Sequence, residues 1–125
     1  MARTGPTNLL KRKLIKGLKK LSKDEQANIW ERISEELSAP RRKMVEANIS
    51  KINRNANEGE VVVVPGKVLG SGKLTKKIVI IAESYSMKAY EKLKKSGAEI
   101  YLLDDLLRNK ELKDKIDSLP KRIIV

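Results

Sequence analysis

The chain has 125 residues, with 28 Lys and Arg against 16 Asp and Glu, and a formal net charge of +12 at pH 7. It has no Cys and no His, which excludes disulfides, Cys/His zinc sites, thiol nucleophiles and imidazole bases. This length predicts one domain, and the basic excess indicates a polyanionic partner. No apolar run is long enough to span a membrane and no signal peptide is evident, so we expect a cytoplasmic protein without a membrane partner.

The first predicted element is a basic amphipathic helix over residues 8–21. Its apolar stripe has helical spacing and consists of Leu10, Leu14, Leu18 and Leu21. Residues 1–23 hold eight basic residues and no acidic one. Lysines that only keep the chain soluble are the alternative, but a stretch this long without an acid favours phosphate contacts. The cations expected to make them are Arg3, Lys11, Arg12, Lys13, Lys16 and Lys19.

A second helix is predicted to begin at Ser22, because Ser22 and Glu25 have the spacing of a capping box. This helix is acidic and carries an apolar stripe of Ala27, Trp30, Ile33 and Leu37. The position of Trp30 on that stripe favours a place in the core over a base-stacking role.

A third helix is predicted within residues 38–59, with Pro40 in its first turn and Gly59 at its end. Its buried stripe is expected to contain Val45, Ile49 and Ile52. A second face can offer charge and amide donors to nucleic acid, with a plain exposed polar face as the alternative: Arg41, Asn48, Lys51 and Asn55. The macrodipole disfavours cations in a first turn, so the adjoining basic run also points to an anionic partner: Arg41, Arg42 and Lys43.

The segment "VVVVPGKVLGSGKLTKK" (61–77) predicts a strand, a Pro-Gly turn, a short strand at 67–69, a Gly-rich loop and a longer strand over 76–83. The segment does not match the motif of a nucleotide-binding P-loop, because Leu74 follows Gly72-Lys73 where Ser or Thr is required, and Lys67 occupies the position of the first glycine. A dinucleotide fingerprint fails at Thr75, and no helix follows the loop.

Glycines still allow the backbone to approach another surface closely, so we expect this loop to contact phosphate. A plain hairpin corner that needs glycines for its turn is the alternative. The residues expected to contribute are Gly66, Lys67, Gly70, Ser71, Gly72 and Lys73.

The rest of the chain predicts a strand–helix–strand crossover with parallel strands. Its helix covers residues 84–97 with Gly97 as C-cap, and the strand after it covers 98–103. Asp104 is expected to cap a short helix, residues 111–117 another, and 121–125 a last strand. Since little else could support catalysis, we expect no enzyme activity, cofactor, metal or small-molecule substrate.

Two segments, "PRRKMVEANISKI" (40–52) and "VVVVPGKVLGSGKL" (61–74), closely resemble the archaeal and eukaryotic large-subunit ribosomal protein eighteen-e family. That family shares a superfamily with bacterial large-subunit protein fifteen. The resemblance implies a non-catalytic constituent of the large ribosomal subunit, without a cofactor, whose partners are ribosomal RNA and neighbouring ribosomal proteins. It also implies an irregular ββα superhelix preceded by helices. RNA contact is implied for the matching positions: Arg41, Arg42, Lys43, Asn48, Lys51, Gly66, Lys67, Gly70, Ser71 and Gly72.

The sequence thus predicts an α/β protein, with N-terminal basic helices followed by a ββα-type core. We expect one domain over 1–125, made of a basic helical segment (1–56) and a β/α core (57–125). The lysine-rich composition is typical of an archaeal source. The alternative functions are a nucleotide-binding enzyme or regulator using residues 65–74, and a basic chromatin or membrane-surface protein.

Overall fold

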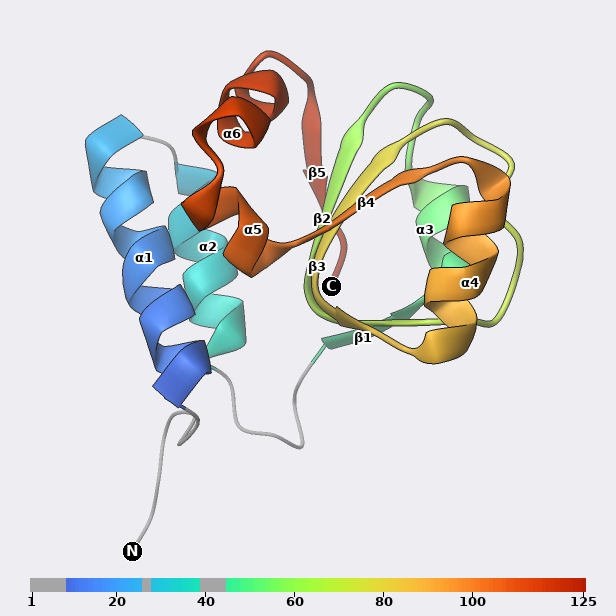
Figure 1. The fold of residues 1–125 in the computed structure, drawn as a ribbon, viewed down its shortest axis with the longest axis horizontal. Coiled ribbons are helices and arrows are strands. Elements are labelled where there is room, and N and C mark those ends of the chain that lie inside the picture. Colours follow the sequence, from blue (N-terminus) through green and yellow to red (C-terminus); the bar gives the residue numbers. More distant parts are fainter. Residues whose placement is uncertain (1–8, 26–27, 39–44) are drawn as a thin grey trace, which may run out of the picture. The chain divides into compact units, whose positions relative to one another are not determined.

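A computed structural model describes residues 9–25, 28–38 and 45–125 (Figure 1). Helices and a sheet of parallel strands confirm the α/β class. The chain divides into two compact units, Met1–Val45 and Glu46–Val125. The first unit ends before the predicted boundary at residue 56, so the helix expected last in the basic segment belongs to the second unit.

In the described residues of the first unit, two helices pack against each other, α1 (Leu9–Glu25) and α2 (Asn28–Leu37). The predicted start of a helix at Ser22 is wrong, because α1 continues through Ser22 to Glu25. No Gly or Pro interrupts Leu18–Glu25, and the helix-forming Lys and Leu residues there extend the first helix. The predicted apolar stripes are confirmed where they are described, with these side chains buried: Leu14, Leu18, Trp30, Ile33 and Leu37. Ala27 lies outside the described residues.

The predicted third helix is wrong over its first part. Val45–Asn48 forms strand β1, and the helix that follows, α3, covers only Ile49–Asn55. β1 joins the sheet beside β2, and this pairing overrides the local preference for helix. Ile49 and Ile52 are fully buried, as expected. Ala56 is the C-cap, so the helix ends before Gly59.

The second unit is built on a five-stranded sheet. Its other strands are β2 (Val61–Leu69), β3 (Val79–Tyr85), β4 (Glu99–Leu102) and β5 (Lys121–Ile123). β2 pairs in parallel with both β3 and β5, and β3 pairs in parallel with β4.

Four helices belong to the second unit. α4 (Met87–Ser96) connects β3 to β4, which confirms the strand–helix–strand crossover. α5 (Leu103–Arg108) and α6 (Lys110–Asp117) follow β4. Figure 1 shows α3 and α4 on one side of the strands and α5 and α6 on the other.

The structure of β2 differs from two of the predictions. It runs without a break through Pro65-Gly66, where we expected a turn between two strands. Between Val64 and Lys67 it advances three residues while β3 advances two, from Ala82 to Ser84, which is a β-bulge. Proline has no N–H to donate to a ladder, and bulges accommodate it. Because β2 and β3 are parallel, residues 70–78 are not a hairpin corner.

The ends of the later helices follow local hydrogen bonds. Ser86 caps α4 by accepting from the Ala89 amide at 3.1 Å, and Gly97 is the predicted C-cap with a φ of +81°. The predicted cap at Asp104 is wrong, because Asp105 accepts from the Leu102 amide at 3.1 Å. Asp104 instead pairs with Arg108 at 3.0 Å.

An ion pair between the largely buried Glu60 and the partly exposed Arg122 joins the start of β2 to β5. Glu60 lies directly before β2, and its side chain is 11% exposed. Its carboxylate accepts from Arg122 Nε at 3.0 Å and from the Asn57 amide. The hydrogen bond from Arg122 and, to a smaller extent, the one from the Asn57 amide hold the pKa of Glu60 below its usual value.

Glu60→Gln should lower the free energy of unfolding near pH 7 by about 1 kcal/mol, because the charged pair with the partly exposed Arg122 is lost. The pKa of Glu60 is lower in the folded state, so this stabilisation is complete above its usual value of 4.5 and disappears as the pH falls further. Urea denaturation at a series of pH values should show the two proteins converging in acid.

Glu99→Gln is the matched control, since the Glu99–Lys115 pair is about half exposed on both sides. We expect it to change stability little. A constant difference between wild type and Glu60→Gln down to acid pH would contradict the assignment.

Candidate nucleic-acid interface

The α1 helix separates its apolar and basic side chains. Leu14, Ile15 and Leu18 are buried, while the following predicted cations are exposed: Arg12, Lys13, Lys16 and Lys19. Lys20, which the prediction omitted, is exposed as well. The first turn of α1 contains no acidic residue. Arg3 and the Lys11 side chain lie outside the described part of the chain.

The predicted basic face of the third helix does not form as expected. Arg41, Arg42 and Lys43 lie outside the described residues, and Asn48 ends a strand. The remaining members have partners within the chain. Lys51 Nζ donates to the Val125 carbonyl at 2.5 Å, and Asn55 Nδ2 donates to the Lys51 carbonyl at 2.8 Å.

The Gly-rich segment lies along α3, to which hydrogen bonds connect it at both ends. At its start, Ser50 N donates to the Ser71 carbonyl at 3.0 Å and Ser71 N donates to Asn48 Oδ1 at 3.3 Å. Farther along, Thr75 N donates to Asn53 Oδ1 at 3.0 Å. Asn48 and Asn53 therefore orient the loop, a role that the sequence pattern did not indicate.

Lysines also stabilise this loop from inside. Lys76 Nζ donates to the Asn53 and Ala56 carbonyls, both at 2.6 Å, where the carboxyl end of α3 favours a cation. Lys92 Nζ, from α4, donates to the Gly70 carbonyl at 2.7 Å and the Gly72 carbonyl at 3.2 Å. The sequence did not indicate this role of Lys92, because the loop and α4 meet only in the folded chain.

The two glycines at the tip of the loop are required by contacts inside the protein. A Cβ on Gly70 would lie 2.7 Å from Lys88 Cγ and 3.0 Å from the Ala89 amide nitrogen. A Cβ on Gly72, whose φ is +104°, would lie 2.5 Å from the Ser50 amide nitrogen. Gly66 is buried in β2. These close approaches account for Gly70 and Gly72 without any external partner.

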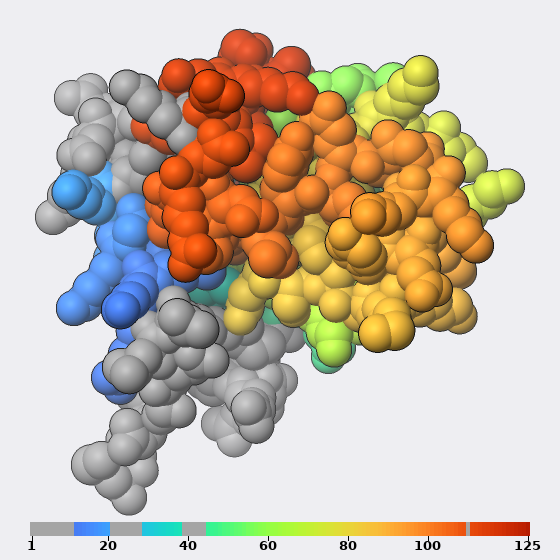
Figure 2. All heavy atoms as spheres, viewed as in Figure 1, coloured from blue at the N-terminus to red at the C-terminus, as the bar shows by residue number. Residues whose placement is uncertain are grey.

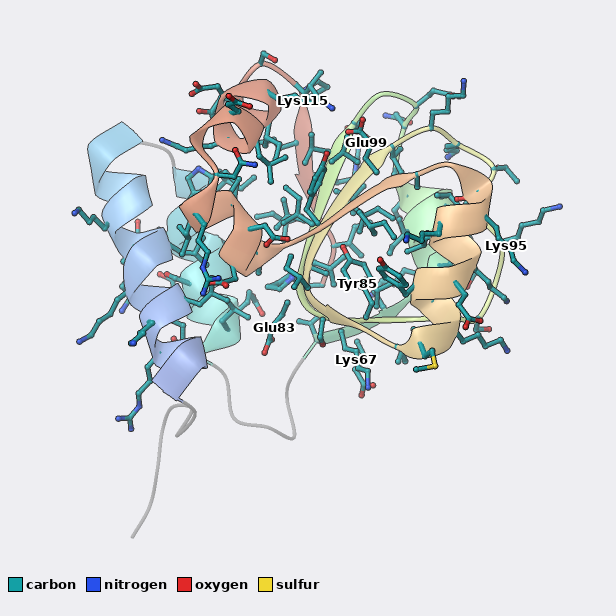
Figure 3. The ribbon with its side chains drawn as sticks, in the orientation of Figure 1. Lys67, Glu83, Tyr85, Lys95, Glu99 and Lys115 are labelled. Atoms are coloured by element: carbon teal, nitrogen blue, oxygen red, sulfur yellow. The ribbon has the colours of Figure 1, made fainter. Side chains whose placement is uncertain are left out.

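The remaining members of the predicted loop site are at the surface. Lys67, Ser71 and Lys73 have exposed side chains, and Figure 3 shows Lys67 pointing away from the strands. Lys67 directly follows the bulge in β2. The end of β2 and the loop after it thus present two lysines and a hydroxyl, groups that can contact a phosphate oxygen.

Other site types receive no support from the described residues. Among them, no group of three or more Asp and Glu side chains could hold a metal ion. No described helix combines the length and apolar character needed to cross a membrane.

Comparison with known proteins adds a family assignment. The family described as ribosomal proteins 50S-L15, 50S-L18e and 60S-L27A matches residues 26–101. The chain is 44% identical over 105 residues to large ribosomal subunit protein eL18 of Pyrobaculum aerophilum, covering 84% of this chain and 86% of that protein. It is 48% identical over 99 residues to eL18 of Sulfolobus acidocaldarius, covering 79% and 80%. For eL18 of Methanothermobacter thermautotrophicus the identity is 42% over 107 residues, covering 86% of each chain.

The chain belongs to this family of ribosomal proteins. Membership in the L15/L18e/L27A family confirms the resemblance predicted from residues 40–52 and 61–74, both of which fall within the matched region. It also confirms that the chain is not an enzyme. The three relatives are archaeal, in agreement with the expected source.

Within this family member, Gly72→Ala should destabilise the second unit more than Gly59→Ala. Both glycines have positive φ, +104° and +83°, so each substitution should cost about 1–2 kcal/mol of backbone strain. Only Gly72 faces a neighbouring backbone, which should add about 1–3 kcal/mol of steric overlap. Urea denaturation of both variants measures the difference.

A Cβ on Gly59 would meet nothing within 4 Å, so Gly59→Ala isolates the effect of φ. Equal losses of stability in the two variants would show that residues 70–72 do not lie against α3.

Proposed function

We propose that the chain is a structural constituent of the large ribosomal subunit that binds and stabilises folded ribosomal RNA. The observation that carries this proposal is the row of exposed cations along α1, in a chain whose family consists of ribosomal proteins. Each cation that neutralises an RNA phosphate releases condensed counterions, which is the main source of affinity for a polyanion. Cytoplasmic ribosomes are the corresponding location.

The α1 cations supply contacts that do not depend on RNA sequence. Lys13, Lys16 and Lys19 recur at helical spacing, so α1 can follow phosphates while its leucines stay buried. A cation held close to two RNA segments reduces the repulsion between their backbones. Such contacts would hold together RNA segments that otherwise repel each other.

The Gly-rich loop contributes differently from what the sequence suggested. Its glycines serve packing against α3 and α4, so they create a rigid surface and do not themselves need to reach RNA. Lys67 at the end of β2 and Lys73 in the loop are exposed lysines with charge to offer, as is Lys77. Because residues 70–77 are already ordered by internal hydrogen bonds, little conformational entropy is lost when RNA docks. Arg41, Arg42 and Lys43 remain proposed contacts by resemblance alone.

The nucleotide-binding alternative gains nothing from the loop. Strand β3, beginning at Val79, and not a helix, follows residues 70–78. The first-turn amides of α3 and α4 that lie beside the glycines already have partners, since Ser50 N donates to the Ser71 carbonyl and Ala89 N donates to Ser86 Oγ. The backbone amides of Ser71 and Thr75 are already bound to Asn48 and Asn53. The alternatives of chromatin binding and membrane-surface binding are supported by basic charge alone, and the tests below distinguish them from RNA binding.

Sedimentation tests the proposed function directly. When cells that express the full chain are lysed at physiological salt, the protein should migrate with large ribosomal subunits in a sucrose gradient. It should be released only when the salt is raised, because phosphate contacts weaken with ionic strength.

A chain that stays in the ribosome-free fraction at physiological salt would refute the proposal. Competition between structured RNA, duplex DNA and anionic vesicles separates the alternatives. Preference for duplex DNA or vesicles would favour a chromatin or membrane-surface protein.

The triple substitution Lys13→Gln, Lys16→Gln and Lys19→Gln should weaken binding to structured RNA and flatten its salt dependence. Three lost phosphate contacts should reduce the slope of log K against log salt by about 2. Filter binding over a range of KCl concentrations measures the slope.

The matched control is the pair Arg108→Gln and Lys115→Gln, whose cations already have acidic partners at 3.0 and 2.7 Å. We expect the control to leave the slope nearly unchanged. If both variants lowered the slope equally, α1 would have no special part in binding.

A further inference from the structure

Helix α4 exposes large apolar side chains that the proposed RNA contacts do not use. Met87 is 80% exposed and Tyr90 is 45% exposed, and they lie one helical turn apart. Ala89 and Leu93 form the buried side of the same helix. Figure 2 shows α4 at the surface that faces the viewer.

Tyr90 differs from the other aromatic residues of the chain. There are four in all, one Trp and three Tyr, and every one lies in the described part. Trp30 is fully buried, whereas Tyr85 and Tyr101 are of intermediate exposure. The Tyr85 hydroxyl lies 2.7 Å from the Tyr101 carbonyl, which holds its ring inside the unit. Tyr90 is thus the one of these four aromatic residues whose side chain is exposed.

The surroundings of Tyr90 are strongly basic. Lys94 Nζ lies 5.1 Å from the centre of the Tyr90 ring, within the range of a cation–π contact. Lys88 and Lys95 are also exposed on α4, and Figure 3 shows Lys95 directed away from the strands. Glu91 is the one acidic residue in the helix sequence MKAYEKLKKS. The ring is therefore flanked by charges suited to a polyanion.

We propose that Tyr90, together with Met87 and Lys94, binds one unpaired RNA base by stacking, while the lysines of α4 contact the adjoining phosphates. This inference rests on the proposed RNA-binding function and assigns a ligand class to a surface outside its predicted site. Bases that leave a helical stack are recognised in this way, on aromatic rings with cations beside them.

Charge favours RNA over a protein as the occupant of this surface. Exposed Met and Tyr are common at protein–protein interfaces, but lysines are depleted there. Burying Lys88, Lys94 and Lys95 against an ordinary protein would remove three charges from water without a matching anion. An RNA strand supplies one phosphate per nucleotide and satisfies both the ring and the charges.

The spacing of residues along α4 also suits a stacked base. Residues 87, 90 and 94 have the three- and four-residue spacing that places side chains on neighbouring positions of one helix surface. A base lying on the Tyr90 ring would be bordered by the Met87 thioether on one side. Lys94 Nζ lies over the ring in the structure, so a base would take the other face or displace Lys94 toward the phosphate of the same nucleotide.

The test uses the full chain and three short RNA hairpins that differ at one position. The first carries a bulged uridine, the second a bulged abasic riboside with the same phosphates, and the third is fully paired. Fluorescence anisotropy at fixed salt should show the tightest binding for the bulged uridine. Its preference over the abasic hairpin should be about 5- to 150-fold, the range expected for one stacked base.

Tyr90→Leu should abolish this preference while leaving the affinity for the abasic hairpin unchanged. Tyr90→Phe keeps the ring and should retain the preference. Lys95→Gln serves as the charge control, because it should weaken all three hairpins to the same extent. Circular dichroism melting of each variant establishes that the fold is intact, as expected for exposed helix positions.

Wild-type protein that binds the uridine and abasic hairpins equally would overturn the inference and leave the proposed function untouched. A preference that survives in Tyr90→Leu would overturn it as well. If Tyr90→Leu changed no RNA affinity but reduced retention in large subunits, the surface would be a protein contact, contrary to the proposal. Failure of the wild type to bind any hairpin or co-sediment with large subunits would instead refute the proposed function.

Discussion

The close approach of residues 70–72 to α3 is the constraint on which the shape of the loop surface depends. Gly72 permits its backbone to pass directly over Ser50, and the Ser50 amide donates to the Ser71 carbonyl. From this point the chain follows α3 as far as Lys77, which allows β3 to begin beside β2 in parallel without an intervening helix. Parallel strands usually need a helical crossover, whereas residues 70–78 connect β2 to β3 without a helix and are hydrogen-bonded to α3.

Lysine has two separate roles in this unit. Lys51, Lys76 and Lys92 direct their ammonium groups to backbone carbonyls and so stabilise the fold. Lys67 and Lys73 remain at the surface beside them. Because these three ammonium groups already have oxygen partners within the chain, the formal net charge of +12 is not all equally available to a polyanion. The available charge lies where side chains are exposed, on α1 and also on α4.

Periodicity and end signals predicted the features that local chemistry decides. The buried residues of α1 and α2, the crossover through α4 and its cap at Gly97 all follow from spacing and from glycine. The failures share another cause. Val45–Asn48 favours a helix in isolation but pairs with β2, which lies farther along the chain. For the same reason the sequence placed Gly70 and Gly72 against an external phosphate: their real neighbours, Lys88 and Ser50, lie about twenty residues away in opposite directions. A local sequence pattern cannot show contacts between segments that lie far apart in the chain.

The pairing of β2 with β5 has a consequence for biosynthesis. Val61–Val63 are fully buried in the finished unit, but their partners on one edge, Lys121–Ile123, are made some sixty residues later. During synthesis, the run of four valines therefore has an unpaired strand edge until β5 is made. Unpaired apolar strands of this kind associate with other unfinished chains. A protein needed in stoichiometric amounts would thus be most vulnerable to aggregation shortly before its last strand is added, and molecular chaperones that shield strand edges would act at that stage.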